Sequence, residues 1–148
     1  MADATIHASA VLVGARAVLI RGAAGAGKSM LALRLLQAAD MRLLPFARLV
    51  ADDRAHVEAC HGRLLVRPAQ QLAGLLEIRG LGVRRLPYEP VAVVGLVTDL
   101  VGAEIARVPQ PDERETSING VSLPRLAVAP GSDPLPRLLA LGHTAQAA

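Results

Sequence analysis

Residues 22–29 read Gly-Ala-Ala-Gly-Ala-Gly-Lys-Ser, which is the G-x-x-x-x-G-K-S spacing of a phosphate-binding loop. Small residues let the backbone curl so that successive N–H groups point at phosphate oxygens. The lysine would reach the outer phosphates, and the serine hydroxyl would bind Mg²⁺. The stretch therefore predicts a nucleoside triphosphate site formed by Gly22, Ala23, Ala24, Gly25, Ala26, Gly27, Lys28 and Ser29.

The residues on either side of this loop supply the elements that it needs. Residues 18–20 form a short apolar, β-like run, and residues 30–36 are helix formers with one apolar face. A strand, a glycine-rich turn and a helix N-terminus together favour phosphate, because unpaired N–H groups and the helix dipole both attract anions. The alternative is an alanine- and glycine-rich turn that matches by chance. The position of the Lys-Ser pair between these elements favours the phosphate loop.

The pattern before the loop predicts a mixed sheet. Two apolar runs, 6–12 and 17–20, flank the turn at 14–16 and predict a hairpin, so the strand that enters the loop has an antiparallel neighbour. The usual β-α-β arrangement has no such neighbour. We expect an α/β fold with a mixed β-sheet, in a single domain over residues 1–148 that is large enough to bury one core.

Further along the chain, short apolar runs alternate with turns. Residues 75–82 begin apolar and end in glycines, which predicts a strand that enters a mobile loop. Residues 107–125 are rich in proline and charge, and we expect them to be irregular. The other expected elements are a helix at 28–39, a buried strand at 48–51, a hairpin with strands at 56–59 and 63–66, a turn or short helix at 68–74, a strand at 91–97 and a terminal helix at 134–141.

Composition narrows the choice of partners. The net charge is only +3, and the two aromatic residues, Phe46 and Tyr88, are too few to stack single-stranded nucleic acid. We therefore expect no nucleic-acid partner, although a triphosphate or an acidic protein would fit the positive charge. Cys60 is the only cysteine, and no apolar run reaches the roughly 18–20 residues of a membrane span. We expect a cytoplasmic protein with no membrane partner.

A triphosphate site also needs carboxylates for Mg²⁺ and, in a kinase, a base near the acceptor hydroxyl. Asp52 and Asp53 end the apolar strand at 48–51, and open α/β sheets place ligands at the carboxyl ends of strands. Adjacent strand residues point to opposite faces, so the two aspartates need not share one role. The alternative is a solvated turn, and the nearby phosphate loop favours the functional interpretation.

Two other stretches offer chemistry. His7 would lie beside the loop-bearing strand if the first hairpin forms, although a lone histidine on a strand is more often structural. Glu77 offers a carboxylate for Mg²⁺, Arg79 offers a cation for phosphate, and the glycines at 80 and 82 would allow movement over a substrate. The alternative for this second stretch is an ordinary junction between strand and loop with a surface ion pair.

Over roughly residues 5–130 the sequence resembles HPr kinase/phosphorylase, in the short form that has only the C-terminal catalytic domain. The resemblance implies a phosphate-loop fold of the phosphoenolpyruvate-carboxykinase type, with ATP and Mg²⁺ as cofactors and a homohexamer as the assembly. The matching segments are His7, the loop at 22–29, Arg48-Leu49-Val50-Ala51-Asp52-Asp53 and, most specifically, Leu75-Leu76-Glu77-Ile78-Arg79-Gly80-Leu81-Gly82.

The resemblance also implies an activity, the ATP-dependent phosphorylation of a serine on the phosphocarrier protein HPr. The opposing reaction would be phosphorolysis of phospho-HPr, in which phosphate takes the phosphoryl group and pyrophosphate is released. Lys28 matches the loop lysine, and Ser29 and Glu77 match Mg²⁺ ligands. Asp53 matches the carboxylate that accepts the serine proton, and Asp52 is its neighbour in the same motif.

Two further residues receive roles from the resemblance alone. His7 matches an active-site histidine, and Arg107 matches an active-site arginine, for which Arg114 is the rival candidate. Some segments depart from the family pattern: residues 41–47 form an insertion, and the segment linked to phosphorolysis is only faint near 123–131. The sequence therefore supports the kinase activity better than the phosphorylase activity.

Two other functions fit the same loop. One is a small-molecule kinase that uses the same aspartates, although no motif for an acceptor pocket is visible. The other is a non-catalytic nucleotide-binding regulator, for which intact Asp52, Asp53 and Glu77 would be unnecessary.

Overall fold

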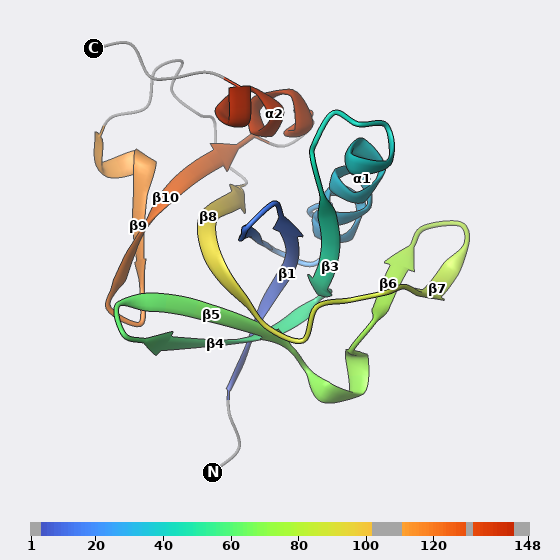
Figure 1. Cartoon of the computed structure of the whole chain (residues 1–148), viewed down its shortest axis with the longest axis horizontal. Helices are drawn as coiled ribbons and strands as arrows, with labels where there is room; N and C mark the ends of the chain where they lie inside the picture. The colour runs from blue at the N-terminus through green and yellow to red at the C-terminus, as the bar shows by residue number, and fades with distance from the viewer. Residues whose placement is uncertain (1–3, 102–110, 130–131, 144–148) are drawn as a thin grey trace.

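The computed structural model describes residues 4–101, 111–129 and 132–143 (Figure 1). The first hairpin, the helix after the loop, the buried strand before the two aspartates, the second hairpin and the terminal helix are all present as predicted. In chain order the elements are β1 (Thr5–Val13), β2 (Arg16–Gly22), α1 (Lys28–Asp40), β3 (Ala47–Ala51), β4 (Arg54–Cys60), β5 (Arg63–Pro68), the 3₁₀ turn η1 (Gln70–Leu72), β6 (Leu75–Ile78), β7 (Gly82–Arg85), β8 (Ala92–Leu100), the 3₁₀ turn η2 (Pro111–Arg114), β9 (Glu115–Ile118), β10 (Val121–Val128) and α2 (Leu135–His143).

The main sheet is mixed, as predicted, and part of it closes on itself. Strands β2, β1, β4, β5 and β8 pair in that order as antiparallel neighbours, and β8 then pairs in parallel with β2. Strand β10 extends the sheet in parallel with β8, and β9 pairs with β10 in the antiparallel sense. The parallel β2–β8 pair brings the carboxyl ends of both strands to the edge where the glycine-rich loop begins.

Two apolar cores lie on opposite faces of β2, because successive strand residues alternate in direction. Ala17 and Leu19 point into the closed ring of strands, and Val18 and Ile20 point outward to α1. The outer core also contains the apolar face of α1, which includes Leu31, Leu35 and Ala38, and α2 covers the same side of the sheet (Figure 1). The helix after the loop is thus fixed to the sheet by burial along its length.

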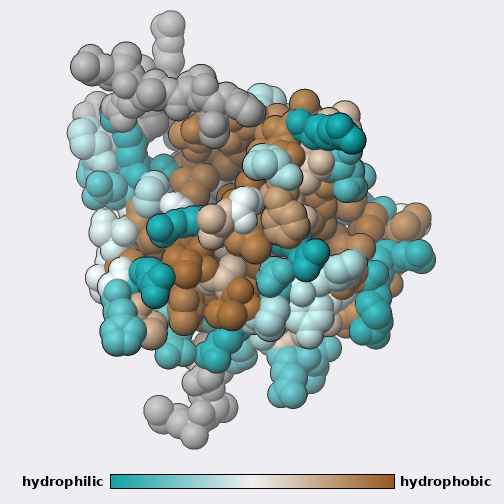
Figure 2. Space-filling model, in the orientation of Figure 1, coloured by the Kyte–Doolittle hydropathy of each residue, from teal (hydrophilic) through white to brown (hydrophobic). Residues whose placement is uncertain are grey.

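The segment at 75–82 begins with the predicted strand, but a tight turn and a second strand follow it where a loop was expected. It forms β6 and turns at residues 79–81 into β7, with the pairs running from Leu75↔Arg85 to Ile78↔Gly82. Gly80 and Gly82 have φ values of +85° and +94°, so the glycines provide the left-handed geometry of a tight turn. In Figure 2 this hairpin forms the lobe on the right, where apolar and hydrophilic side chains lie together on the surface.

The prediction that residues 107–125 are irregular is wrong for the part that the structure describes. Strands β9 and β10 form a hairpin around Asn119 and Gly120, whose φ values are +50° and +79°. Asn-Gly is the strongest short-range signal of such a hairpin, because both residues tolerate a positive φ. The prolines and charges of the segment obscured this signal.

No helix within the described residues is long and apolar enough to cross a membrane.

Candidate functional site

The glycine-rich loop joins the carboxyl end of β2 to the first turn of α1. Gly25 and Gly27 adopt φ values of +82° and +103°, a region that residues with side chains rarely occupy. The N–H of Ala26 donates a hydrogen bond to the carbonyl of Ala23, 3.0 Å away, and closes the turn between them. Glycine thus stands at the two positions where the backbone conformation requires it.

Lys28 is the first residue of α1, and its side chain lies under the loop. Its Nζ donates hydrogen bonds to the carbonyl oxygens of Gly22 at 2.8 Å and Ala23 at 3.1 Å. The residue is only 6% exposed. A single ammonium group is thus held at the junction of the strand, the loop and the helix N-terminus, where the helix dipole already favours an anion.

The two aspartates interrupt one long strand beside β1. Strand β3 pairs with β1 up to Ala51, with a register shift between Ala10 and Val11, and β4 continues the register of the Ala10↔Ala51 pair from Arg54 onward. Asp52 and Asp53 lie in the gap, opposite Ser9 and its neighbour in β1. The bonds that remain across the gap hold both aspartates to a buried strand, so their backbone positions are well defined.

Asp52 is a buried hub that connects four elements. The hydroxyls of Ser9 and Ser29 both donate to its Oδ1 at 2.7 Å, and the backbone N–H of Glu77 donates to Oδ2 at 3.2 Å. The carboxylate therefore joins β1, the start of α1, the end of β3 and strand β6. Ser9 had not been predicted as a site residue; its only sequence signal is a polar side chain inside an apolar run.

Asp53 occupies a different environment from its neighbour, because its side chain is exposed. Its backbone has a φ of +68°, and its N–H donates to the Ser9 hydroxyl at 3.2 Å. A cavity of about 410 Å³ lies over it, which we call the charged cavity; its polar lining includes Lys28, Ser29, Asp53, Glu77 and Arg79. The structure thus brings together the loop, one aspartate and the Glu77 segment.

The predicted histidine and arginines are placed differently. His7 is exposed on β1, pairs with Arg54 and lies on the same face as Ser9, but it is not among the described residues that line the charged cavity. Arg107 lies outside the described residues. Arg114, the rival candidate, ends η2 at the β9–β10 hairpin and does not line the charged cavity either.

The oxygen ligands that the charged cavity offers are few, as is usual for Mg²⁺ sites that bind a triphosphate. Among the described residues, no three His, Cys, Asp or Glu side chains gather into a metal cluster. Mg²⁺ in such sites takes only one or two protein oxygens and keeps the rest of its shell for phosphates and water. The Ser29 hydroxyl donates a hydrogen bond to Asp52, so the lone pairs of its oxygen remain available to a cation.

A second buried carboxylate, which the sequence analysis did not predict, lies on the strand beside the residue that precedes the loop. Asp99 on β8 accepts hydrogen bonds from Arg21 Nε at 2.7 Å and Arg125 Nε at 2.5 Å. Burial alone would raise the pKa of Asp99, but the bonds and charges of the two arginines outweigh it and hold that pKa below its ordinary value. This ion cluster joins β2, β8 and β10 where the loop begins.

The lowered pKa of Asp99 predicts how its contribution depends on pH. In the unfolded chain the pKa of an aspartate is about 4. The ionised Asp99 therefore makes its full contribution to the free energy of unfolding above that pH, and this contribution is lost as the pH falls further. The difference in free energy of unfolding between the wild type and Asp99→Asn should therefore narrow below about pH 4. Urea unfolding of both proteins at several pH values from 7 to 3 measures this difference in free energy. A constant difference over this range would contradict the assignment.

Comparison with known proteins places this arrangement in a family. A family model described as the HPr serine kinase C-terminal domain matches residues 1–86. The HPr kinase/phosphorylase of Streptococcus thermophilus is 42% identical over 80 residues, which are 53% of this chain and 24% of that protein. The enzyme of Limosilactobacillus reuteri is 32% identical over 136 residues, or 84% of this chain and 40% of that protein. The chain thus spans well under half the length of these curated relatives.

A solved structure extends the comparison to nearly the whole chain. The HPr(Ser) kinase/phosphatase from Coxiella burnetii superposes with a TM-score of 0.73 at 24% identity, and the match covers 95% of this chain and 90% of that one. A likeness at this identity establishes a shared fold. The family model matches more than half of the residues of this chain, and the chain therefore belongs to the HPr serine kinase C-terminal domain family.

Proposed function

We propose that this protein transfers the γ-phosphoryl group of ATP to a serine of HPr. The observation that carries the proposal is the charged cavity, in which Lys28 and Ser29 of the loop share one space with Asp53 and Glu77. A phosphoryl transfer needs a cradle for the donor, a base for the acceptor and little else. Family membership supports HPr as the acceptor.

The donor half of the site would be the loop. Its backbone N–H groups and the N-terminus of α1 would hold the phosphates, and Lys28 would neutralise charge on the outer ones. In this arrangement the ammonium group would exchange its bonds to the Gly22 and Ala23 carbonyls for bonds to phosphate oxygens. We infer that the fold is the phosphate-loop fold of the phosphoenolpyruvate-carboxykinase type.

Mg²⁺ would be held by the Ser29 hydroxyl and the Glu77 carboxylate, and when bound it would neutralise the phosphate charge that develops during transfer. Asp52 is a positioning residue in this account, because it holds the Ser29 hydroxyl and the Glu77 backbone at once. Truncating Asp52 would therefore disturb both ligands together.

Asp53 would orient the acceptor serine and accept its proton during in-line attack on the γ-phosphorus. Its exposed carboxylate lies at the solvent side of the charged cavity, where a protein substrate can reach it. His7 and Arg107 would stabilise the transferring group. In phosphorolysis, phosphate would attack the phosphorus of phospho-HPr and form pyrophosphate as the bond from phosphorus to the serine oxygen breaks, and Asp53 would return a proton to that oxygen.

The remaining parts of the proposal concern the molecule as a whole. We infer that residues 1–148 act as one catalytic unit, in the cytoplasm, and assemble into hexamers. Light scattering of the purified chain measures the assembly independently of activity.

Replacing Lys28 with methionine should weaken ATP binding by about 10- to 100-fold, because charge-assisted hydrogen bonds contribute roughly 1.5–3 kcal/mol. Isothermal titration calorimetry measures the change. The matched control is Arg63→Met, which removes one positive charge from an exposed position on β5 and should leave the affinity unchanged. Equal affinities in all three proteins would contradict the role of Lys28.

A second test of the same residue needs no substitution. Lys28 is the only lysine in the chain, so protein made with ¹³C-labelled lysine gives a lysine spectrum from this site alone. ATP should shift the side-chain signal as its partners change from carbonyls to phosphate. An unchanged spectrum at saturating ATP would place the nucleotide elsewhere.

The proposed activity is tested by incubating the protein with ATP, Mg²⁺ and purified HPr and searching HPr for phosphoserine by mass spectrometry. The proposal predicts one phosphoserine per HPr. ATP binding without any transfer would favour a nucleotide-binding regulator, and transfer to a small metabolite instead would favour the small-molecule kinase.

A further inference from the structure

Ser9 is a fully buried polar residue in an otherwise apolar part of β1. It is 0% exposed, and its neighbours Ala8 and Ala10 point into the closed ring of strands. Because successive strand residues alternate in direction, the Ser9 side chain points to the opposite face, which carries α1. Burying a hydroxyl costs free energy unless it is hydrogen-bonded, so the partners of Ser9 indicate its role.

The Ser9 hydroxyl bridges the two aspartates. Its O–H donates to Asp52 Oδ1 at 2.7 Å, and its oxygen accepts the backbone N–H of Asp53 at 3.2 Å. A hydroxyl has one proton to donate and lone pairs with which to accept, so both bonds form at once and fix its orientation. One side chain thus holds the Asp52 carboxylate and the Asp53 backbone in a fixed relation.

The backbone at Asp53 has a conformation that needs such support. The N–H of Arg54 donates to the carbonyl of Asp52 at 2.8 Å, which closes a γ-turn around Asp53, whose φ is +68°. A γ-turn with a positive φ is the rarer and more strained form, and a residue with a side chain keeps it only where its surroundings hold it. Two hydrogen bonds from β1 do so among the described residues: the one to the Ser9 hydroxyl, and one from the N–H of Ala8 to the Asp53 carbonyl at 3.1 Å.

The same contacts connect the proposed proton acceptor to the proposed metal ligand. The Ser29 hydroxyl donates to Asp52 Oδ1 at 2.7 Å, so Ser9 and Ser29 bind one oxygen atom from two different elements. The position of Asp53 relative to Ser29 is therefore set through Ser9 and Asp52. In phosphoryl transfer the rate depends steeply on how the acceptor and its base are placed against the metal-bound phosphoryl group.

We propose that Ser9 is a positioning residue for phosphoryl transfer, whose hydroxyl holds the turn that directs the Asp53 carboxylate at the acceptor serine. This inference rests on the proposed function, since it takes Asp53 as the proton acceptor. Ser9 does not line the charged cavity, so it acts through the aspartates and not on a substrate.

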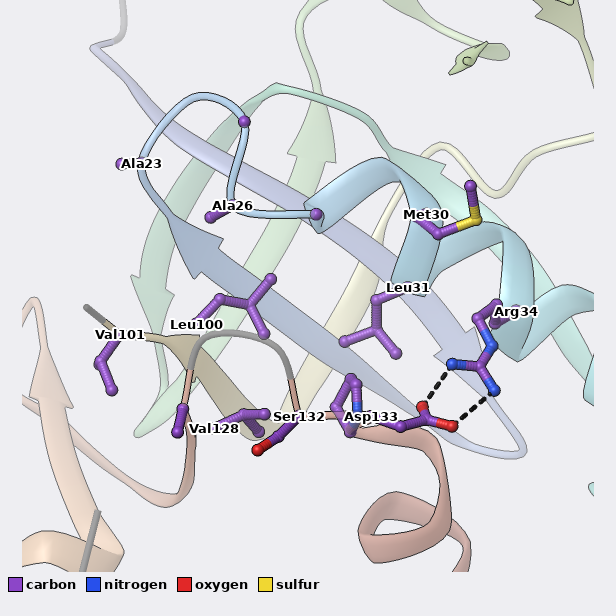
Figure 3. A pocket seen from close by; sticks show the side chains of 14 residues that line it. Ala23, Ala26, Met30, Leu31, Arg34, Leu100, Val101, Val128, Ser132 and Asp133 are labelled. Carbon is purple, nitrogen blue, oxygen red and sulfur yellow. Dashed lines mark hydrogen bonds and ion pairs between the residues drawn. The ribbon is translucent and has the colours of Figure 1, made fainter. Parts of the chain in front are cut away.

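The glycine-rich loop has a support of its own that does not include Ser9. In Figure 3, Leu31 of α1 and Leu100 of β8 lie below the loop; Leu31 belongs to the outer core and Leu100 packs against it. A Cβ at Gly22 would lie 3.1 Å from the Cβ of Leu100, so the start of the loop packs closely on β8. Lys28 is held by carbonyls of the loop. Loss of the Ser9 hydroxyl should therefore leave ATP binding intact.

The test compares Ser9→Thr with Ser9→Val, two variants of nearly equal shape that differ in the hydroxyl. Ser9→Val should have a kcat for HPr phosphorylation about 10- to 100-fold below that of Ser9→Thr, because the turn at Asp53 loses its side-chain support. The Kd for ATP should differ by less than about twofold between them. Ser9→Ala, compared with the wild type, removes the same hydroxyl without added volume and serves if the larger side chains prevent folding.

A double-mutant cycle separates positioning from a merely structural role. In the Asp53→Asn background, Ser9→Val and Ser9→Thr should have rates within about twofold of each other, because the carboxylate that Ser9 positions is gone. The matched control is Thr98→Val, which removes another fully buried hydroxyl from the same sheet. The Thr98 hydroxyl has no hydrogen-bond partner among the described residues, so its loss should leave kcat unchanged.

The outcomes distinguish this proposal from the one on which it rests. Equal kcat values for Ser9→Thr and Ser9→Val, or the same ratio of rates with and without the Asp53 carboxylate, would overturn the role of Ser9 and leave the kinase proposal standing. A wild type that transfers no phosphate to HPr would overturn the kinase proposal, and the role of Ser9 with it.

Discussion

Asp53→Asn should lower the rate of HPr phosphorylation by about 10²- to 10⁴-fold, the usual contribution of a positioned general base. The amide keeps the size of the carboxylate but cannot accept the serine proton. ATP binding should remain close to that of the wild type, because the Asp53 side chain is exposed and the buried hub at Asp52 is untouched. Initial rates at saturating ATP and HPr measure the effect.

The matched control for this variant is Asp40→Asn. Asp40 is an exposed aspartate at the other end of α1, remote from the loop, so its amide should leave the rate unchanged. If Asp53→Asn transferred phosphate at the rate of the wild type, the proton acceptor would have to be another group.

Asp99→Asn should lower the free energy of unfolding by about 2–3 kcal/mol, between the loss for an exposed ion pair and that for a fully buried one, because the carboxylate is buried and its arginine partners are partly exposed. The variant would leave Arg21 and Arg125 facing each other beside a neutral amide, with Asp99 only 8% exposed in the native fold. Urea unfolding followed by circular dichroism at pH 7 measures the loss.

An exposed pair on the β4–β5 hairpin is the control for Asp99. Glu58 bonds Arg67 at 2.9 Å, but their side chains are 56% and 43% exposed, so Glu58→Gln should cost less than about 1 kcal/mol. If Asp99→Asn and Glu58→Gln lost similar free energies of unfolding, the greater burial of Asp99 would not strengthen its ion pairs, contrary to this prediction.

The parts of the fold that could be predicted are those with local signals. The first hairpin, the loop and α1 follow one another within about forty residues, and each is marked by its own glycines or apolar period. The strand that precedes Asp52 was predicted for the same reason. Strand β6 was predicted, but its partner β7 was missed because the glycines between them also suit a mobile loop. The β9–β10 hairpin was missed although Asn119-Gly120 marks its turn.

The contacts that organise the site could not be predicted, because they join residues far apart in the sequence. Asp52 and Ser9 are 43 positions apart, and Arg21 and Asp99 are 78 apart. Neither pair belongs to a motif, and each arises only when strands pair in a particular order. The closure of the ring through β2 and β8 is likewise a property of the whole topology.

The account is tested most directly by a single-turnover experiment with the wild-type protein in excess over γ-labelled ATP, in the presence of Mg²⁺ and HPr. The account predicts that the label leaves ATP and appears on a serine of HPr at the same rate, with little free phosphate. Label that stays on ATP, or passes to water at the same rate with and without HPr, would contradict the claim that this loop and Asp53 form a protein-serine kinase site.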